Sequence, residues 1–142
     1  MVVKASLVNI LGQTIATNIK FINLTPHPIN LVDPATNKVF LTIPPSGKVA
    51  RVKTMQKTVK TIDFDLNGYL TSVDIKKTEY GEIENLPEPQ PNTIYIVSTI
   101  VLVALRDKGI KRDDIVAPDT TPNSVVRDEK GNIIGVKGFQ TL

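Results

Sequence analysis

Residues 92–109 read NTIYIVSTIVLVALRDKG, and this stretch decides the fold of the chain. Its first half is an apolar run with Tyr95 and several β-branched residues, which predicts a buried strand. Its second half predicts the one helix of the protein, over about residues 98–108. Ser98 is the expected N-cap, and Gly109 stands where a left-handed residue commonly ends a helix. The stretch can anchor a core, but it contains no recognisable chemistry.

The remaining sequence predicts hairpins. The clearest spans residues 62–73, where Asn67-Gly68 separates two alternating strands, because both residues of such a tight turn need positive φ. This turn would pair side chains across one face of the hairpin: Leu66 with Tyr69, Phe64 with Thr71, and Ile62 with Val73. Further strand pairs are predicted over residues 2–24, 29–43 and 125–136. Residues 79–91 are acidic and rich in proline, which predicts a stiff, extended connection.

These elements predict a mainly β protein with roughly eight strands. The expected architecture is an antiparallel β barrel or sandwich built from hairpins, with a single α-helix packed on it. A chain of 142 residues suits one domain. We expect a β-rich globular domain over residues 21–142, preceded by an N-terminal strand or arm over residues 1–20.

Composition argues against several classes of function. The chain has no cysteine and one histidine, which removes thiolate chemistry and argues against a zinc site or a histidine-based triad. Seventeen basic residues stand against fourteen acidic ones, and they are spread out, so nucleic acid is not an expected partner. No apolar run reaches the roughly 18 residues of a membrane span, so no membrane partner is expected either.

His27 lies between two prolines in the segment TPHP, which holds it on a stiff, extended backbone. The histidine has two open interpretations: it is structural, or it contacts a ligand. Guanidinium groups converging on an imidazole and a tyrosine would suit a phosphate or a nucleotide. The candidate ligand-binding residues are therefore Asn23, Thr25, His27, Arg51, Tyr80, Arg112 and Arg127. No catalytic residue, metal ligand or cofactor is assigned.

Two acidic clusters leave an alternative open. Glu79, Glu82, Glu84 and Glu88 precede the central stretch, and Asp113, Asp114 and Asp119 follow it. Either cluster has the oxygen ligands that Mg²⁺ prefers. The favoured interpretation is that both are solvated loops, with Arg112 pairing locally with the adjacent Asp113.

A series of motifs resembles a small family of uncharacterised proteins found in bacteriophages, prophages and bacterial or archaeal genomes. The motifs lie within residues 21–136 and are, in order, NLTPHP at 23–28, PSG at 45–47, VARV at 49–52, YGE at 80–82, LPEP at 86–89, TIYIVS at 93–98, RDD at 112–114 and VRDE at 126–129. The chain departs from the family pattern by a longer N-terminus (residues 1–20) and a longer segment over residues 53–78. The resemblance implies a viral or mobile-element accessory protein, with His27, Arg51, Arg112 and Arg127 as candidates for a shared site.

Three functions follow as expectations. The first is a non-enzymatic accessory protein that binds a partner or a small anionic, nucleotide-like ligand, with a role against host defence as one version. The alternative is a structural, virion or assembly protein that forms homo-oligomers through β edges. The third, a metal- or histidine-dependent phosphodiesterase, is the weakest, because no acid and base stand at a recognisable spacing. The expected location is the cytoplasm of a host cell or a virion.

Overall fold

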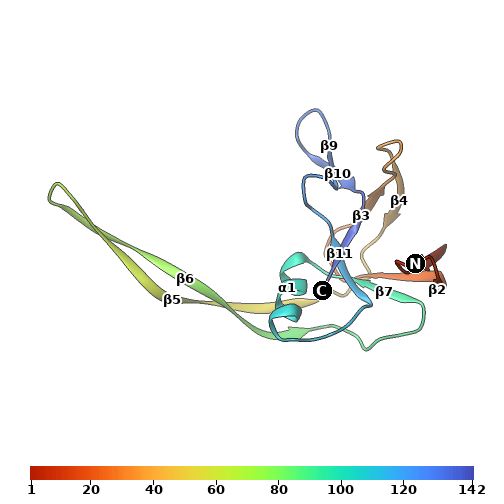
Figure 1. The fold of residues 1–142 in the computed structure, drawn as a ribbon, viewed down its shortest axis with the longest axis horizontal. Helices are drawn as coiled ribbons and strands as arrows, with labels where there is room; N and C mark the ends of the chain where they lie inside the picture. Colours follow the sequence, from red (N-terminus) through yellow and green to blue (C-terminus); the bar gives the residue numbers. More distant parts are fainter.

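The computed structural model describes all of residues 1–142, which form eleven strands and one helix (Figure 1). The prediction of a mainly β protein with a single helix is therefore confirmed. The strands are β1 (Val2–Val8), β2 (Thr14–Asn23), β3 (Ile29–Val32), β4 (Val39–Ile43), β5 (Arg51–Leu66), β6 (Tyr69–Glu84), β7 (Thr93–Ile96), β8 (Ile115–Pro118), β9 (Val125–Arg127), β10 (Ile133–Val136) and β11 (Phe139–Thr141). The helix α1 covers Thr99–Asp107.

The strands form three sheets. One has five strands in the order β1-β2-β7-β8-β11, one has four in the order β4-β3-β10-β9, and β5 pairs only with β6. The two larger sheets fit the predicted sandwich, and neither closes into a barrel. Both contain parallel neighbours, so the fold is not built from hairpins alone: β7 runs parallel to β2 and β8, and β10 runs parallel to β3. The β7-α1-β8 unit is a crossover connection, which parallel neighbours require.

The core lies where residues 92–109 were expected to place it. Tyr95 and Val97 are completely buried, and α1 turns Val101, Leu102 and Leu105 towards the sheet. The helix begins after Ser98, whose side chain makes no capping hydrogen bond, and Gly109 follows it with a φ of 71°. A second cluster joins Ile29, Ile43 and Ile96 on the other side. No helix has the length and apolar character needed to cross a membrane.

The hairpin β5–β6 extends away from the rest of the molecule (Figure 1). Asn67 and Gly68 turn with φ values of 55° and 90°, and the three predicted cross-strand pairs are all observed. Each strand has 16 residues, so the hairpin is roughly 50 Å long at about 3.3 Å per residue. Residues 79–84 belong to β6, and the proline-rich connection is therefore shorter than the sequence suggested. We call β5–β6 the arm.

A second, shorter hairpin projects at the N-terminus, where β1 pairs with β2. Residues 1–20 are not set apart from the domain, because β2 continues without interruption into the five-stranded sheet and pairs with β7 through Asn23. The two projecting hairpins contain residues 1–20 and 53–78.

Candidate functional site

The double-proline corner is tied together by its own polar side chains. Asn23, which is 1% exposed, donates from Nδ2 to the carbonyl oxygens of His27 (2.8 Å) and Ile43 (3.1 Å). Its Oδ1 accepts from the backbone N–H (3.0 Å) and the hydroxyl (2.7 Å) of Thr25. The corner thus uses the backbone carbonyl of His27, while the imidazole is exposed and makes no hydrogen bond with the chain. The polar groups of Asn23 and Thr25 hold the backbone of the corner.

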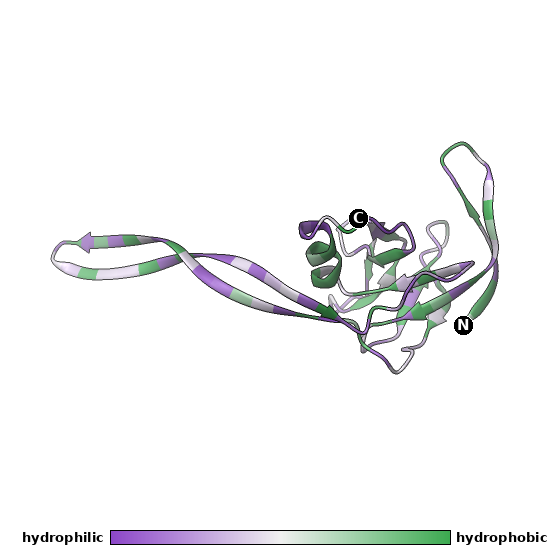
Figure 2. Cartoon of the chain, turned by 90° about the horizontal axis from the view of Figure 1, so that it is seen from below, coloured by the Kyte–Doolittle hydropathy of each residue, from purple (hydrophilic) through white to green (hydrophobic).

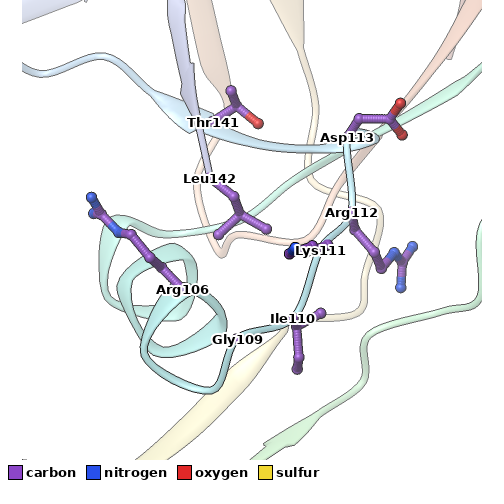
Figure 3. Close-up of a pocket in the computed structure, with 8 residues that line it drawn as sticks. All are labelled: Arg106, Gly109, Ile110, Lys111, Arg112, Asp113, Thr141 and Leu142. Carbon is purple, nitrogen blue, oxygen red and sulfur yellow. The ribbon is translucent and has the colours of Figure 1, made fainter.

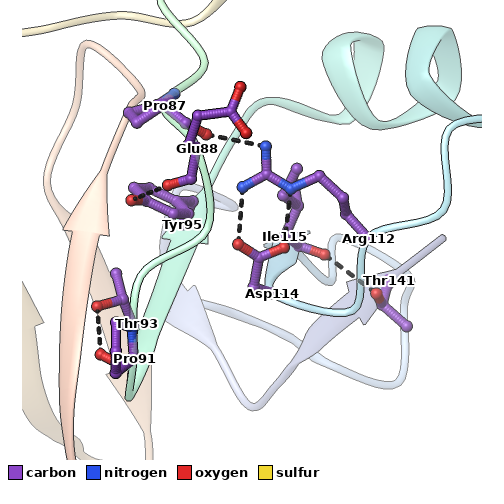
Figure 4. A network of polar contacts seen from close by, with 9 residues as sticks. All are labelled: Pro87, Glu88, Pro91, Thr93, Tyr95, Arg112, Asp114, Ile115 and Thr141. Carbon is purple, nitrogen blue, oxygen red and sulfur yellow. Dashed lines mark hydrogen bonds and ion pairs between the residues drawn. The ribbon is translucent and has the colours of Figure 1, made fainter.

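Arg112 lies in a second polar network, which Figure 4 shows. Its guanidinium donates two hydrogen bonds to Asp114, at 3.0 and 2.7 Å, and a third to the carbonyl oxygen of Pro87 at 2.8 Å. The same group lies 5.7 Å from the centre of the Tyr95 ring, and the Tyr95 hydroxyl donates to the carbonyl oxygen of Glu88 at 2.9 Å. The network fastens the proline-rich connection to β7 and β8.

The environment of this network shifts two pKa values. Burial raises the pKa of Tyr95, and the nearby Asp114 carboxylate raises it further, while Arg112 acts in the opposite direction. The hydrogen bonds to Asp114 raise the pKa of Arg112. Both shifts keep the network in the protonation state in which its hydrogen bonds form.

The remaining candidates lie in separate parts of the fold. Arg127 donates to the carbonyl oxygen of Gly131 (2.8 Å) in the β9–β10 turn, and Tyr80 is half-buried opposite Thr54 near the base of the arm. Arg51 begins β5 opposite Glu84, and its side chain forms no hydrogen bond or ion pair with the chain. Of the seven candidates, the structure brings Arg51 and Thr25 to one groove and Asn23, Thr25 and His27 to one corner.

The groove that Arg51 and Thr25 share lies where the arm meets the domain. It has a volume of about 370 Å³, and its walls combine apolar residues with two basic ones: Leu24, Thr25, Pro26, Val49, Ala50, Arg51, Val52, Lys53, Glu84, Ser98, Ile100 and Val101. The N-terminal end of α1 opens towards it, and the first turn of the helix holds no acidic residue. Arg51 and Lys53 give the groove basic character, and Glu84 opposes it.

A larger hollow, of about 660 Å³, lies beside the C-terminal end of α1 (Figure 3). Arg106, Lys111 and Arg112 line it, but Figure 3 shows the side chains of Arg106 and Arg112 pointing away from each other. The hollow therefore does not focus its positive charges on one point. No three His, Asp or Glu side chains gather in an arrangement that could hold a metal ion, so neither acidic cluster brings three of its carboxylates together.

The arm carries a long surface that its own chain leaves uncovered. Because side chains alternate across a strand pair, the register places six apolar residues on one side of its outer half: Ile62, Phe64, Leu66, Tyr69, Val73 and Ile75. Their exposed fractions lie between 36% and 68%. We call this surface the apolar arm face. Figure 2 shows the alternation of apolar and polar residues along both strands.

The opposite side of the outer arm is mostly polar. Asp63 accepts a hydrogen bond from Ser72 (2.6 Å), and Asp74 accepts one from Thr61 (3.4 Å), while Leu70 is the one large apolar residue there. Charge also changes along the arm. Three carboxylates occupy the outer part, which we call the acidic tip (Asp63, Asp65 and Asp74), and four lysines lie next to it, in what we call the basic shaft (Lys57, Lys60, Lys76 and Lys77).

The N-terminal hairpin also presents apolar side chains. Ile10 and Leu11 at its tip are 101% and 79% exposed. Asn9 holds the turn rigid, because its Oδ1 accepts from the backbone N–H groups of Leu11 (3.0 Å) and Gln13 (2.9 Å). The sequence predicted strands in both hairpins, but it did not predict that the apolar faces of these hairpins would be left uncovered. The signal was present as alternating apolar residues along both hairpins.

No family model matches the sequence, no curated protein matches it, and no solved structure matches the fold.

Proposed function

We propose that the protein is a non-enzymatic assembly protein whose arm joins it to other folded chains, in the first place to copies of itself. The single observation that carries this proposal is the arm: two 16-residue strands that pair only with each other and expose a continuous apolar face. The proposal selects the assembly alternative from the functions that the sequence suggested.

The stability of a bare strand pair supports this function. A two-stranded hairpin is only marginally stable in water, and three strands or a packed neighbour are normally needed. Only the base of the arm has such a neighbour: Val52 and Ile83 pack against the domain core. Beyond the base, no part of the chain covers Ile62 or Phe64, so an external partner is the natural source of the missing contacts.

The exposed area supports the same conclusion. Apolar burial contributes about 25 cal/mol per Å² removed from water, so a chain that leaves six large side chains uncovered gains by associating. Both edges of the arm also carry unpaired backbone groups along their length, a feature that soluble proteins usually shield. Within residues 60–75 the register places one charged residue, Lys60, on this face, opposite Ile75.

Light scattering coupled to size-exclusion chromatography tests the proposal directly. The wild-type chain is expected to elute as an oligomer at protein concentrations of about 10–100 μM, a range in which micromolar interfaces are populated. The double substitution Ile62→Thr and Phe64→Thr places β-branched residues at both strand positions and removes two of the six apolar side chains of the apolar arm face. This variant is expected to elute as a monomer.

Leu70→Thr is the matched control. Leu70 is in the same arm, is 72% exposed, and lies on the opposite side, so this substitution removes a more exposed apolar side chain without touching the apolar arm face. The control is expected to assemble as the wild type does. A monomeric wild type, or a face variant that assembles as well as the control, would overturn the proposal.

The groove beside Arg51 favours a second function, the binding of a small anion. Arg51 has no partner within the chain, Lys53 lies near it, and the uncapped end of α1 faces the same space. Mass spectrometry of small molecules released from the purified protein, with thermal-shift titrations of nucleotides and phosphate, tests this function. Arg51→Ala should abolish a shift caused by such a ligand, and the absence of any bound or stabilising anion would end it.

The resemblance to phage-associated proteins supplies a setting for the leading proposal. In that setting the chain would act as an assembly component or accessory protein in a virion or in the cytoplasm of an infected cell. Fractionation of purified particles from a producing strain tests it, with co-sedimentation of the chain as the expected result.

A further inference from the structure

The charge pattern of the arm determines how two arms would lie together. The arm ends in the acidic tip, and the basic shaft follows immediately towards the domain. If two arms ran side by side in the same direction, each tip would face a tip and each shaft a shaft, so that like charges would meet. If they ran in opposite directions, each tip would lie over the other copy's shaft.

We propose that two copies of the chain pair through their apolar arm faces, antiparallel, about a twofold axis near the Ile62–Val73 pair. This proposal deepens the assembly function and rests on it. A second copy is the chosen partner because the arm is self-complementary in charge and in apolar character, which is the condition that an interface with twofold symmetry imposes.

The register follows from the cross-strand pairs. Each cross-strand pair of the arm is a rung, which we number by its β5 residue. Asp65, Asp63 and Asp74 lie at rungs 65, 63 and 61, whereas the four lysines lie at rungs 60, 58 and 57. Opposite charges come level when the rung numbers of the two arms add up to about 122 or 123. The axis then passes close to rung 61, next to Ile62 and Val73, in the middle of the apolar residues.

The same register matches the apolar side chains. Leu66 and Tyr69 at the end of one arm lie over Lys57 and Lys77 of the other copy, whose aliphatic stems can cover the ring and the leucine. In the free chain, Lys57 and Lys77 stand directly opposite each other, an unfavourable pair of like charges. The partner's acidic tip would relieve it.

The register sets the length over which the two arms overlap. Rungs 57 to 66 span roughly 33 Å at about 3.3 Å per residue, and stacked sheets pack about 10 Å apart. The arm is only two strands wide, so carboxylates on its outer side remain within about one Debye length of the partner's lysines at moderate salt. Salt should therefore weaken the pairing while leaving the apolar contact in place.

Cross-linking tests the geometry, and the chain suits it because it has no cysteine of its own. Single substitutions in the full chain are made at Ile62, Tyr69, Lys77 and Leu70, each to Cys, and oxidised under mild conditions. Antiparallel pairing predicts that Ile62→Cys links to itself and that Tyr69→Cys links to Lys77→Cys in a mixture. Leu70→Cys, on the opposite side, should remain unlinked.

Each other pattern overturns the inference. Efficient self-linking of Tyr69→Cys would indicate parallel arms. Linking of Leu70→Cys in place of Ile62→Cys would indicate that the wrong face had been chosen. If the chain still assembles through its arm but gives either pattern, or no Ile62 link, the antiparallel pairing fails while the assembly function stands. A monomeric wild type defeats both.

A charge-exchange experiment gives an independent readout. One variant reverses the tip (Asp63, Asp65 and Asp74 to Lys), and another reverses the shaft (Lys57, Lys60, Lys76 and Lys77 to Glu). Each alone places like charges together and should lower self-association at least about tenfold at low salt. Mixing the two restores opposite charges at both ends, so heterodimers should form; an equal mixture that remains monomeric would contradict the proposed register.

Discussion

Arg112 offers the sharpest test of how the structure assigns its polar residues. The sequence placed it in a ligand site, but its guanidinium is used by Asp114 and by the carbonyl oxygen of Pro87. We expect Arg112→Met to lower the free energy of unfolding, because it leaves the Asp114 carboxylate and the Pro87 carbonyl without their donors while keeping the volume of the side-chain stem. A residue reserved for a ligand would show the opposite: little loss without the ligand.

The magnitude follows from burial. Removing one partner of a fully buried ion pair costs about 3–5 kcal/mol. Here the two side chains keep 16% and 14% of their surface exposed, so water compensates in part, and we expect a loss of about 2–3 kcal/mol. For a chain of this length that corresponds to a fall in melting temperature of roughly 6–10 °C.

Urea denaturation followed by circular dichroism measures the effect, at one fixed protein concentration because association alters apparent stability. The double variant Arg112→Met with Asp114→Asn removes both charges, so its loss should be smaller than the sum of the single losses by about 1–2 kcal/mol. A single-variant loss below about 0.5 kcal/mol, within the usual range of surface substitutions, would refute the structural role and return Arg112 to the ligand hypothesis.

Three further predictions concern the domain. Gly135→Ala places a Cβ 2.6 Å from the carbonyl oxygen of Asn30, so β10 and β3 must separate; thermal denaturation should show a loss of about 1–3 kcal/mol, and an unchanged midpoint would contradict the close packing. Asn23→Ala removes the Nδ2 donor to the carbonyl oxygens of His27 and Ile43 and the acceptor of the buried Thr25 N–H, and should cost about 3 kcal/mol by urea titration; proteolysis at the corner should increase, and full resistance would argue against it. The pKa of Tyr95 is raised in the folded state. Its contribution to the free energy of unfolding is therefore present below the unfolded pKa of about 10 and is lost as pH rises through the folded pKa. Urea midpoints at increasing alkaline pH should therefore fall more steeply for the wild type than for Tyr95→Phe, and equal slopes would contradict this.

Local chemistry explains what could be predicted from sequence. The Asn67-Gly68 turn and its three strand pairs were predictable because turn geometry and alternation act over a few residues. The β7–α1 element was predictable because an apolar run followed by a helical tail and Gly109 leaves few alternatives. The parallel pairing of β2, β7 and β8 was not, because neighbours in a mixed sheet depend on contacts between distant segments.

The candidate site shows the same division. Residue type led to the prediction that Asn23, Thr25 and Arg112 bind a ligand, but it did not indicate the contacts that these side chains make within the chain. In the structure those contacts are with backbone carbonyls and a carboxylate of the same chain. Both a backbone corner that lacks regular strand pairing and a bound ligand need side chains that are rich in hydrogen-bond donors. Only the structure shows whether such a side chain holds the backbone or is free to bind a ligand.

The apolar arm face shows what an alternating sequence predicts and what it leaves open. Alternation over residues 62–73 predicted which side chains share one face of the hairpin, and in soluble proteins such a face is usually buried. The pattern reports that a face is apolar, but not what covers it. Here the covering group is absent from the chain itself: Ile62, Phe64 and Val73 are about as exposed as surface residues, although their alternation is that of a core. A sequence that specifies a core face and a structure that leaves it open are reconciled if the second half of that core is supplied by another molecule.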